Sequence, residues 1–204
     1  IYLTGNPQIT FFKVVYRRHT NFALEAIEQT FNGTVDFGRK VSCTVSRNGD
    51  LIHKVYLQVD LPAMTMSSGT ASWTRNIGHV IVDYVNIEIG GQEIDRHYGD
   101  WLNIWNELTQ TAEKEDGYNV MIGSTVALTT PAASIPAATL YIPLQFWFCR
   151  NPGLALPLIA LQYHEVKIIV EHKFGAVFEK NVADQQLWVD YIFLDTDERR
   201  RFAQ

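Results

Sequence analysis

Residues 41–61 constrain the fold more than any other part of the chain, because two runs of alternating apolar and polar residues flank an Asn-Gly pair. Apolar residues occupy every second position before Arg47 and again from Val55 to Leu61. Such alternation gives each strand one apolar and one polar face. Asn48-Gly49 supplies the two positive-φ residues of a type I′ turn. The pattern therefore predicts a long antiparallel hairpin with one buried face.

Similar strand-like segments recur along the chain. They cover residues 22–31, 80–89, 92–98, 139–149, 163–174 and 186–196, and Gly90-Gly91 is expected to turn the second into the third. Long loops are expected at 62–78 and 118–138. Strands that follow one another without intervening helices predict an antiparallel β-sandwich and exclude an alternating α/β fold.

One helix is expected between Asp100 and Gly117. Asp100 fits an N-cap, and apolar residues follow at helical spacing, namely Trp101, Ile104, Trp105, Leu108 and Ala112. Because two of these residues are tryptophans, the helix is expected to lie across one end of the sandwich and to plug it.

The composition is that of a globular protein with a core, since 47% of the 204 residues are hydrophobic and 19% are charged. The net charge of −5 argues against non-specific nucleic-acid binding. No stretch reaches the roughly 18 apolar residues that a membrane span needs, and no secretory signal is visible. Cys43 and Cys149 lie in apolar, strand-like runs, which favours two buried thiols in a reducing compartment over a disulfide.

No catalytic, cofactor-binding or metal site is expected. His164 and His172 lie in a strand-like segment, where eight residues separate them by about 26 Å, too far to bind one ion. Nucleophile-elbow and phosphate-loop patterns are absent, and a thiolate is disfavoured in the apolar runs around the cysteines. Scattered carboxylates such as Asp95 and Asp190 leave a β-sandwich hydrolase open, but the sequence does not favour an enzyme.

Two short basic clusters, Arg17-Arg18-His19 and Arg199-Arg200-Arg201, are expected on solvated faces. Their expected ion-pair partners are Glu25, Glu28 or Glu198. A role at a subunit interface is the alternative, because arginine is enriched in interfaces.

Five blocks of the sequence carry a resemblance that spans almost the whole chain, in order. They are "YLTGNPQITFFKVVYRRHTNFALEAIEQTFNG", "KVSCTVSRNGDLI", "IEIGGQEIDRHYGDW", "NPGLALPLIALQYHEVKI" and "WVDYIFLDTDERRRFAQ". These blocks closely resemble the major capsid protein of large nucleocytoplasmic DNA viruses, of the chlorovirus and iridovirus type. The departures fall in the loops 62–78 and 112–138 and around 174–185.

The resemblance implies an all-β fold, an antiparallel jelly-roll β-sandwich with one short end helix. Residues 1–204 would be the first of two jelly rolls, and a second jelly roll would follow Gln204. Within the first, residues 1–21 would form an N-terminal arm near neighbouring subunits or the internal viral membrane. The complete subunit would form homotrimeric, pseudo-hexagonal capsomers of an icosahedral virion shell.

The resemblance also implies the partners and the compartment. Neighbouring capsomers and minor capsid proteins would be the partners. No specific nucleic acid and no cofactor would be bound. Assembly would take place in the cytoplasm of the infected cell. Two alternatives remain open. One is a minor capsid paralogue of the same fold, and the other is a carbohydrate-binding jelly roll that uses Trp73, Tyr118 or Trp188 as sugar platforms.

Overall fold

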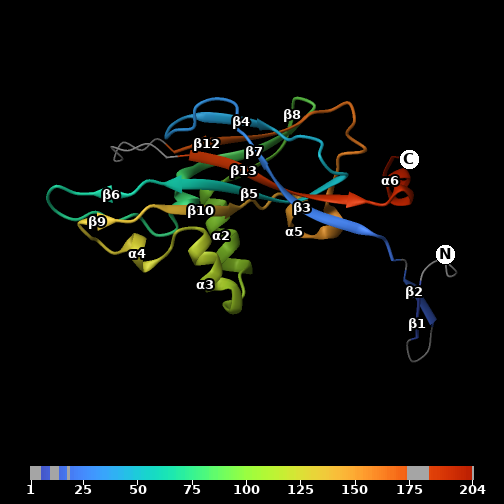
Figure 1. Cartoon of the computed structure of the whole chain (residues 1–204), viewed down its shortest axis with the longest axis horizontal. Helices are drawn as coiled ribbons and strands as arrows, with labels where there is room; N and C mark the ends of the chain where they lie inside the picture. The colour runs from blue at the N-terminus through green and yellow to red at the C-terminus, as the bar shows by residue number, and fades with distance from the viewer. Residues whose placement is uncertain (1–5, 10–13, 18, 174–183, 204) are drawn as a thin grey trace.

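Two antiparallel sheets form a sandwich in this computed structural model, which describes residues 6–9, 14–17, 19–173 and 184–203 (Figure 1). Sheet 1 has the strand order β10-β5-β13-β3, and sheet 2 has the order β4-β12-β7-β8. These strands are β3 (Phe22–Gln29), β4 (Lys40–Thr44), β5 (Leu51–Leu61), β7 (Val82–Ile89), β8 (Gln92–Tyr98), β10 (Ala138–Pro143), β12 (Val166–His172) and β13 (Asp184–Leu194). The chain crosses between the sheets after nearly every strand, which is the connectivity of a jelly roll. The predicted all-β jelly roll is therefore confirmed.

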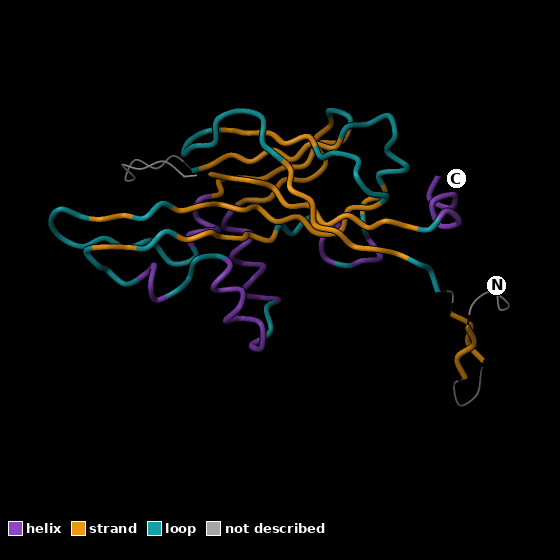
Figure 2. The backbone as a smooth tube through the Cα atoms, in the orientation of Figure 1, coloured by secondary structure: helices purple, strands orange, loops and turns teal. Residues whose placement is uncertain are grey.

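Short elements occupy the connections. They are β1 (Asn6–Ile9), β2 (Val14–Arg17), β6 (Met64–Thr65), β9 (Ser134–Ile135), β11 (Leu156–Pro157), α1 (Ile77–Ile81), α2 (Gly99–Thr109), α3 (Ala112–Met121), α4 (Val126–Thr129), α5 (Trp147–Arg150), the 3₁₀-helix η1 (Pro152–Leu154) and α6 (Thr196–Ala203). β1 pairs with β2, β11 adds to β5, and β6 pairs with β9. The β6–β9 pair joins the two long loops into one projection at the end of the sandwich (Figure 2).

The core lies between the two sheets and follows the predicted alternation. Val55, Leu57, Val59 and Leu61 of β5 are all buried. The residues between them are at least partly accessible to solvent. Cys43 on β4 and Cys149 are buried free thiols, as expected, although Cys149 lies in α5 and not in a strand.

The predicted hairpin at Asn48-Gly49 is wrong. β4 pairs with β12, whereas β5 pairs with β10 and β13, so the two runs belong to different sheets. Neither Asn48 nor Gly49 has a positive φ. The alternation reported two half-buried strands correctly, but it carries no information about which strands pair.

Residues 47–50 instead cross from sheet 2 to sheet 1. The backbone N–H of Asp50 donates to Ile192 O at 3.0 Å, and the Asp50 carboxylate accepts from the N–H of Leu194 at 2.7 Å. Gly49 has no room for a side chain, because an added Cβ would lie 2.7 Å from Cβ of Tyr191. The glycine is therefore required by close approach to β13 and not by turn geometry.

The type I′ geometry occurs at the other glycine pair. Gly90 and Gly91 have φ values of 61° and 82°, and Ile89 pairs with Gln92 across the two-residue loop. The predicted turn between residues 80–89 and 92–98 is confirmed, except that residues 77–81 form α1 and the strand begins at Val82.

The expectation of one helix that plugs an end is wrong in number and place. The described residues contain six α-helices, and the segment predicted as one helix is divided into α2 and α3 at Gln110 and Thr111. Asp100 lies in the first turn of α2, with Tyr98 at the N-cap, and Gly117 lies within α3. α2 packs on β7 and β8 and α3 on β10, so the helices close the side between these strands (Figure 1).

Candidate assembly surfaces

The outer face of sheet 1 carries an apolar strip at its β3 edge. Phe22 and Leu24 are 65% and 60% exposed, and they pair with Leu194 and Ile192 of β13. Because directly paired residues share a face of a sheet, this set faces away from the core. We call it the apolar strip, and it consists of Phe22, Leu24, Ala26, Trp188 and Leu194; on the same face Ile192 is buried, and the carboxylates of Asp190 and Glu28 lie opposite Ala26 and Trp188.

β3 is also an edge strand. Among the described residues, β13 pairs with one side of β3 and no strand pairs with the other. Edge strands that present apolar side chains are templates for association, and soluble proteins usually cover or charge them. The sequence predicted this strand, but its periodicity did not reveal that the apolar face lies outside the sandwich.

The outer face of sheet 2 is charged. Nδ2 of Asn86 and Nη2 of Arg96 both donate to Oε2 of Glu93, at 2.6 and 2.5 Å. The Arg96 guanidinium lies 4.5 Å from the centre of the Tyr84 ring, and Nζ of Lys40 lies 5.9 Å from it. The hydrogen bond from Arg96 is the main cause that lowers the pKa of the Glu93 carboxyl. The charged side chains of this face interact with one another, and Tyr98, which pairs with Tyr84, is 51% exposed beside them.

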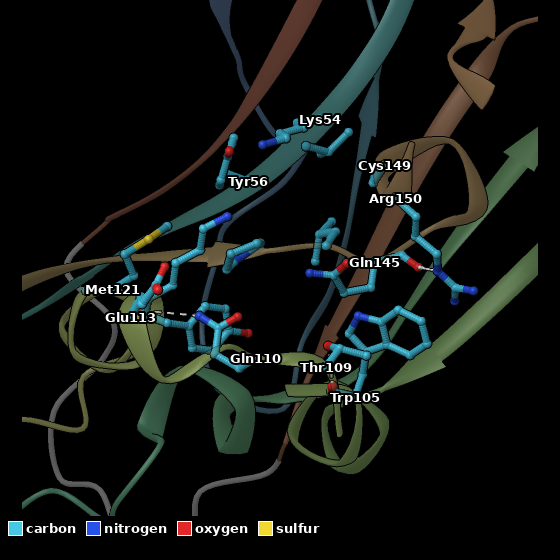
Figure 3. Close-up of a pocket in the computed structure, with 16 residues that line it drawn as sticks. Lys54, Tyr56, Trp105, Thr109, Gln110, Glu113, Met121, Gln145, Cys149 and Arg150 are labelled. Atoms are coloured by element: carbon cyan, nitrogen blue, oxygen red, sulfur yellow. Dashed lines mark hydrogen bonds between the residues drawn. The ribbon is translucent and has the colours of Figure 1, made fainter. Parts of the chain in front are cut away.

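A cavity of about 620 Å³ lies between β5 and the helices α2, α3 and α5 (Figure 3). Lys54 and Tyr56 reach it from β5, Trp105 from α2, Lys114 from α3 and Arg150 from α5. The Arg150 guanidinium stacks 4.3 Å from the centre of the Trp105 ring, a cation–π contact.

The buried thiol in the cavity wall is chemically inert. Burial raises the pKa of Cys149 to about 12, although nearby Arg150 and Lys54 act in the opposite direction. Burial likewise raises the pKa of Cys43 to about 11. Since only the thiolate is an effective nucleophile, neither cysteine is suited to covalent catalysis.

The residues weighed for catalysis or metal binding do not form a site. His172 lies buried in β12, whereas His164 lies in the loop before the strand. Asp95 lies 3.1 Å from Nε2 of His97, and burial raises the pKa of Asp190. Within the described part of the chain, no three His, Cys, Asp or Glu side chains are grouped as metal ligands would be.

The three candidate sugar platforms are engaged in the fold. Trp73 is buried in the core. The Tyr118 hydroxyl lies 2.9 Å from Nε2 of His79, and Nε1 of Trp188 donates to Oε1 of Gln58 at 2.7 Å. Burial excludes Trp73 as a platform, whereas Tyr118 and Trp188 are partly accessible.

The C-terminal basic cluster forms local ion pairs. Arg201 pairs with Glu198 at 3.4 Å, as predicted, but Arg199 pairs with Asp50 at 3.0 Å, a partner that the sequence did not indicate. Of the N-terminal cluster, Arg18 lies outside the described residues. None of the described helices has the length and apolar character to cross a membrane.

Comparison with known proteins gives a consistent family match. Residues 10–195 match the family described as "Major capsid protein N-terminus". The chain is 60% identical to the major capsid protein of Pyramimonas orientalis virus, over all of this chain and 52% of that protein. It is 45% identical to the major capsid protein of Paramecium bursaria Chlorella virus 1, again over its full length and over 47% of the relative. The chain thus spans about half the length of these relatives.

A solved structure supports the same relationship. A chain of the PBCV-1 virus capsid, described as a quasi-atomic model, is 42% identical and superimposes with a TM-score of 0.80. The match covers 96% of this chain and 48% of that one.

Proposed function

The chain belongs to the viral major capsid protein family, whose N-terminal region it matches, and from this premise we propose that it is the first jelly roll of a capsid subunit. The role is structural and non-enzymatic, and the protein resides in the virion shell. The apolar strip is the observation that carries this proposal, since Phe22 and Leu24 are exposed on an edge strand. This half of the subunit leaves the strip in water, whereas a complete subunit within a shell would bury it.

The finer assignment concerns assembly. We propose that a second jelly roll follows Gln204 and that three complete subunits form a pseudo-hexagonal capsomer. Two similar sandwiches per subunit would give a trimer the six-fold outline that a hexagonal array needs. Obligate interfaces of this kind bury on the order of 2,000 Å² or more, and the apolar strip would contribute to one of them.

Further partners follow from the same proposal. Neighbouring capsomers and minor capsid proteins would contact the assembled trimer, and residues 1–21 would form an arm near adjacent subunits or the internal membrane. Assembly would take place in the cytoplasm of the infected cell. No cofactor, metal or specific nucleic acid has a role in this account.

The test is the molar mass of the purified full-length protein, measured by light scattering after size-exclusion chromatography. A stable trimer at micromolar concentration is the expected result, and a monomer would refute the capsomer assignment. A minor capsid paralogue is the second candidate, because the fold is the same. Quantifying the protein in purified virions separates the two, since a major capsid protein must be the most abundant shell component.

A further inference from the structure

We propose that the cavity between β5, α2, α3 and α5 binds an extended acidic peptide segment of another virion protein, an inference that rests on the proposed capsid function. The cavity wall carries three cationic side chains, Lys54, Lys114 and Arg150, against a single carboxylate, Glu113. The chain as a whole has a net charge of −5. A local surplus of positive charge in an acidic protein marks a surface suited to an anionic partner.

Arg150 is held in place, and Lys54 interacts with the Asp190 carboxylate only beyond ion-pair distance. Nε of Arg150 donates to the backbone oxygen of Gln145 at 3.1 Å, and its guanidinium stacks on Trp105 (Figure 3). No described carboxylate lies within ion-pair distance of Arg150, Lys54 or Lys114. A pre-positioned guanidinium binds a carboxylate through two parallel hydrogen bonds at little entropic cost. Arg150 is therefore expected to be the main anchor for an incoming carboxylate.

The remaining wall suits a peptide. The side-chain amides of Gln110 and Gln145 can donate to and accept from a peptide backbone. Met121 and Pro143 add aliphatic surface, and Tyr56, Trp105 and Tyr118 add aromatic surface, on which apolar side chains of a peptide can pack. A volume of about 620 Å³ is that of a ligand site and exceeds what one inorganic anion requires.

A different protein is favoured over a second copy of this chain as the occupant. Large apolar side chains are exposed at the apolar strip and also on the helices beside the cavity, where Leu108 and Val120 are 76% and 63% exposed, so the charge of the cavity wall and not the apolar surface decides for an acidic partner. The cavity lies toward β10, at the opposite edge of sheet 1 from the strip. The cavity can therefore remain accessible after subunits have associated through the strip.

Fluorescence anisotropy with the full-length trimer tests the inference. The probe is a fluorescein-labelled Glu-Leu-Glu-Glu-Leu-Glu peptide, and the same peptide with Gln in place of Glu is the control. We expect saturable binding of the acidic probe and at least about tenfold weaker binding of the Gln peptide. Lys54→Gln and Arg150→Gln should each weaken binding of the acidic probe about tenfold; the melting temperature should be unchanged in Lys54→Gln and slightly lower in Arg150→Gln, which loses the contact with Trp105. Lys167→Gln, which removes a cation from the outer face of sheet 2, should leave it within about twofold.

Several results would overturn the inference. Absence of saturable binding to the trimer, or equal affinity for wild type and Arg150→Gln, would reject the site. Binding to dissociated subunits but not to the trimer would assign the cavity to a second copy, and tighter binding of a sulfated oligosaccharide would assign it to sugars. Light scattering of the same samples separates the two proposals: an intact trimer without binding rejects only the cavity, whereas a monomer that binds the probe rejects only the capsomer.

Discussion

The two outer faces of the sandwich differ although the inner faces are alike. Sheet 2 presents Glu93, Arg96 and Lys40, which interact with one another or with Tyr84. Sheet 1 presents Phe22 and Leu24 at an edge strand. Residues 22–26 of β3 are all exposed, so neither face of this end of the strand is buried in the core of the jelly roll. The charged side chains of sheet 2 interact with one another, whereas the exposed apolar end of β3 indicates a partner.

The largest expected effect comes from a charge in the apolar strip. Leu24→Lys should abolish trimer formation at micromolar concentration, because a buried, unpaired ammonium is strongly unfavourable in an interface. Light scattering gives the oligomeric state, and the melting temperature shows whether the sandwich is intact.

The matched control is Ile94→Lys on sheet 2. Ile94 is 50% exposed, close to the 60% of Leu24, but it lies on β8. This variant should trimerise normally. Loss of the trimer in Ile94→Lys together with its retention in Leu24→Lys would show that sheet 2, and not sheet 1, forms the interface.

The second prediction tests the crossing that joins the two sheets into one body. Gly49→Val should lower the free energy of unfolding by about 3 kcal/mol, because the new Cβ would lie 2.7 Å from Cβ of Tyr191. Chemical denaturation measures the change. The control Gly117→Ala adds a Cβ with nothing within 4 Å, so it should stabilise α3 by about 0.5–1 kcal/mol. Equal stability of Gly49→Val and wild type would show that the crossing is looser than described.

Acid should destabilise the fold through three buried histidines, of which His97 and His172 lie in strands of sheet 2 and His79 lies in α1. Burial lowers the pKa of all three, that of His79 to about 4. The unfolded chain therefore binds more protons below pH 6.5, and stability falls as the pH drops from there toward 4. Protonation linked to His79 alone should lower the free energy of unfolding at pH 5 by about 2 kcal/mol relative to neutral pH.

Unfolding measured at pH 7 and pH 5 checks this dependence. His79→Gln can keep a hydrogen bond to the Tyr118 hydroxyl but cannot be protonated, so it should lose less stability than wild type over this interval. Identical losses in the two proteins would contradict the role of His79.

The smallest effect is expected from the charged face. Glu93→Gln removes an exposed ion pair with Arg96, whose side chain is 38% exposed, so it should leave the melting temperature nearly unchanged and the trimer intact. Loss of assembly in this variant would show that sheet 2 also forms an interface.

Periodicity predicted most strands and their buried faces, because alternation reports burial directly. It failed at residues 41–61, where partner choice depends on contacts with β12 and β13 that are distant in sequence. It also missed the break between α2 and α3. The apolar strip escaped prediction since an alternating strand does not show which of its faces meets the core. The cavity escaped because its cations come from three separate elements, β5, α3 and α5.

Thiol labelling of two cysteine variants tests most directly whether assembly buries the outer face of sheet 1. Ala26→Cys lies in the apolar strip and Thr44→Cys on the outer face of sheet 2, and both native positions are exposed. Cys43 and Cys149 give little background, because burial raises the pKa of both thiols. We predict that trimerisation protects the introduced thiol at position 26 from labelling and leaves the labelling rate at position 44 unchanged. Equal labelling of the Ala26→Cys variant in trimer and dissociated subunit would contradict the account.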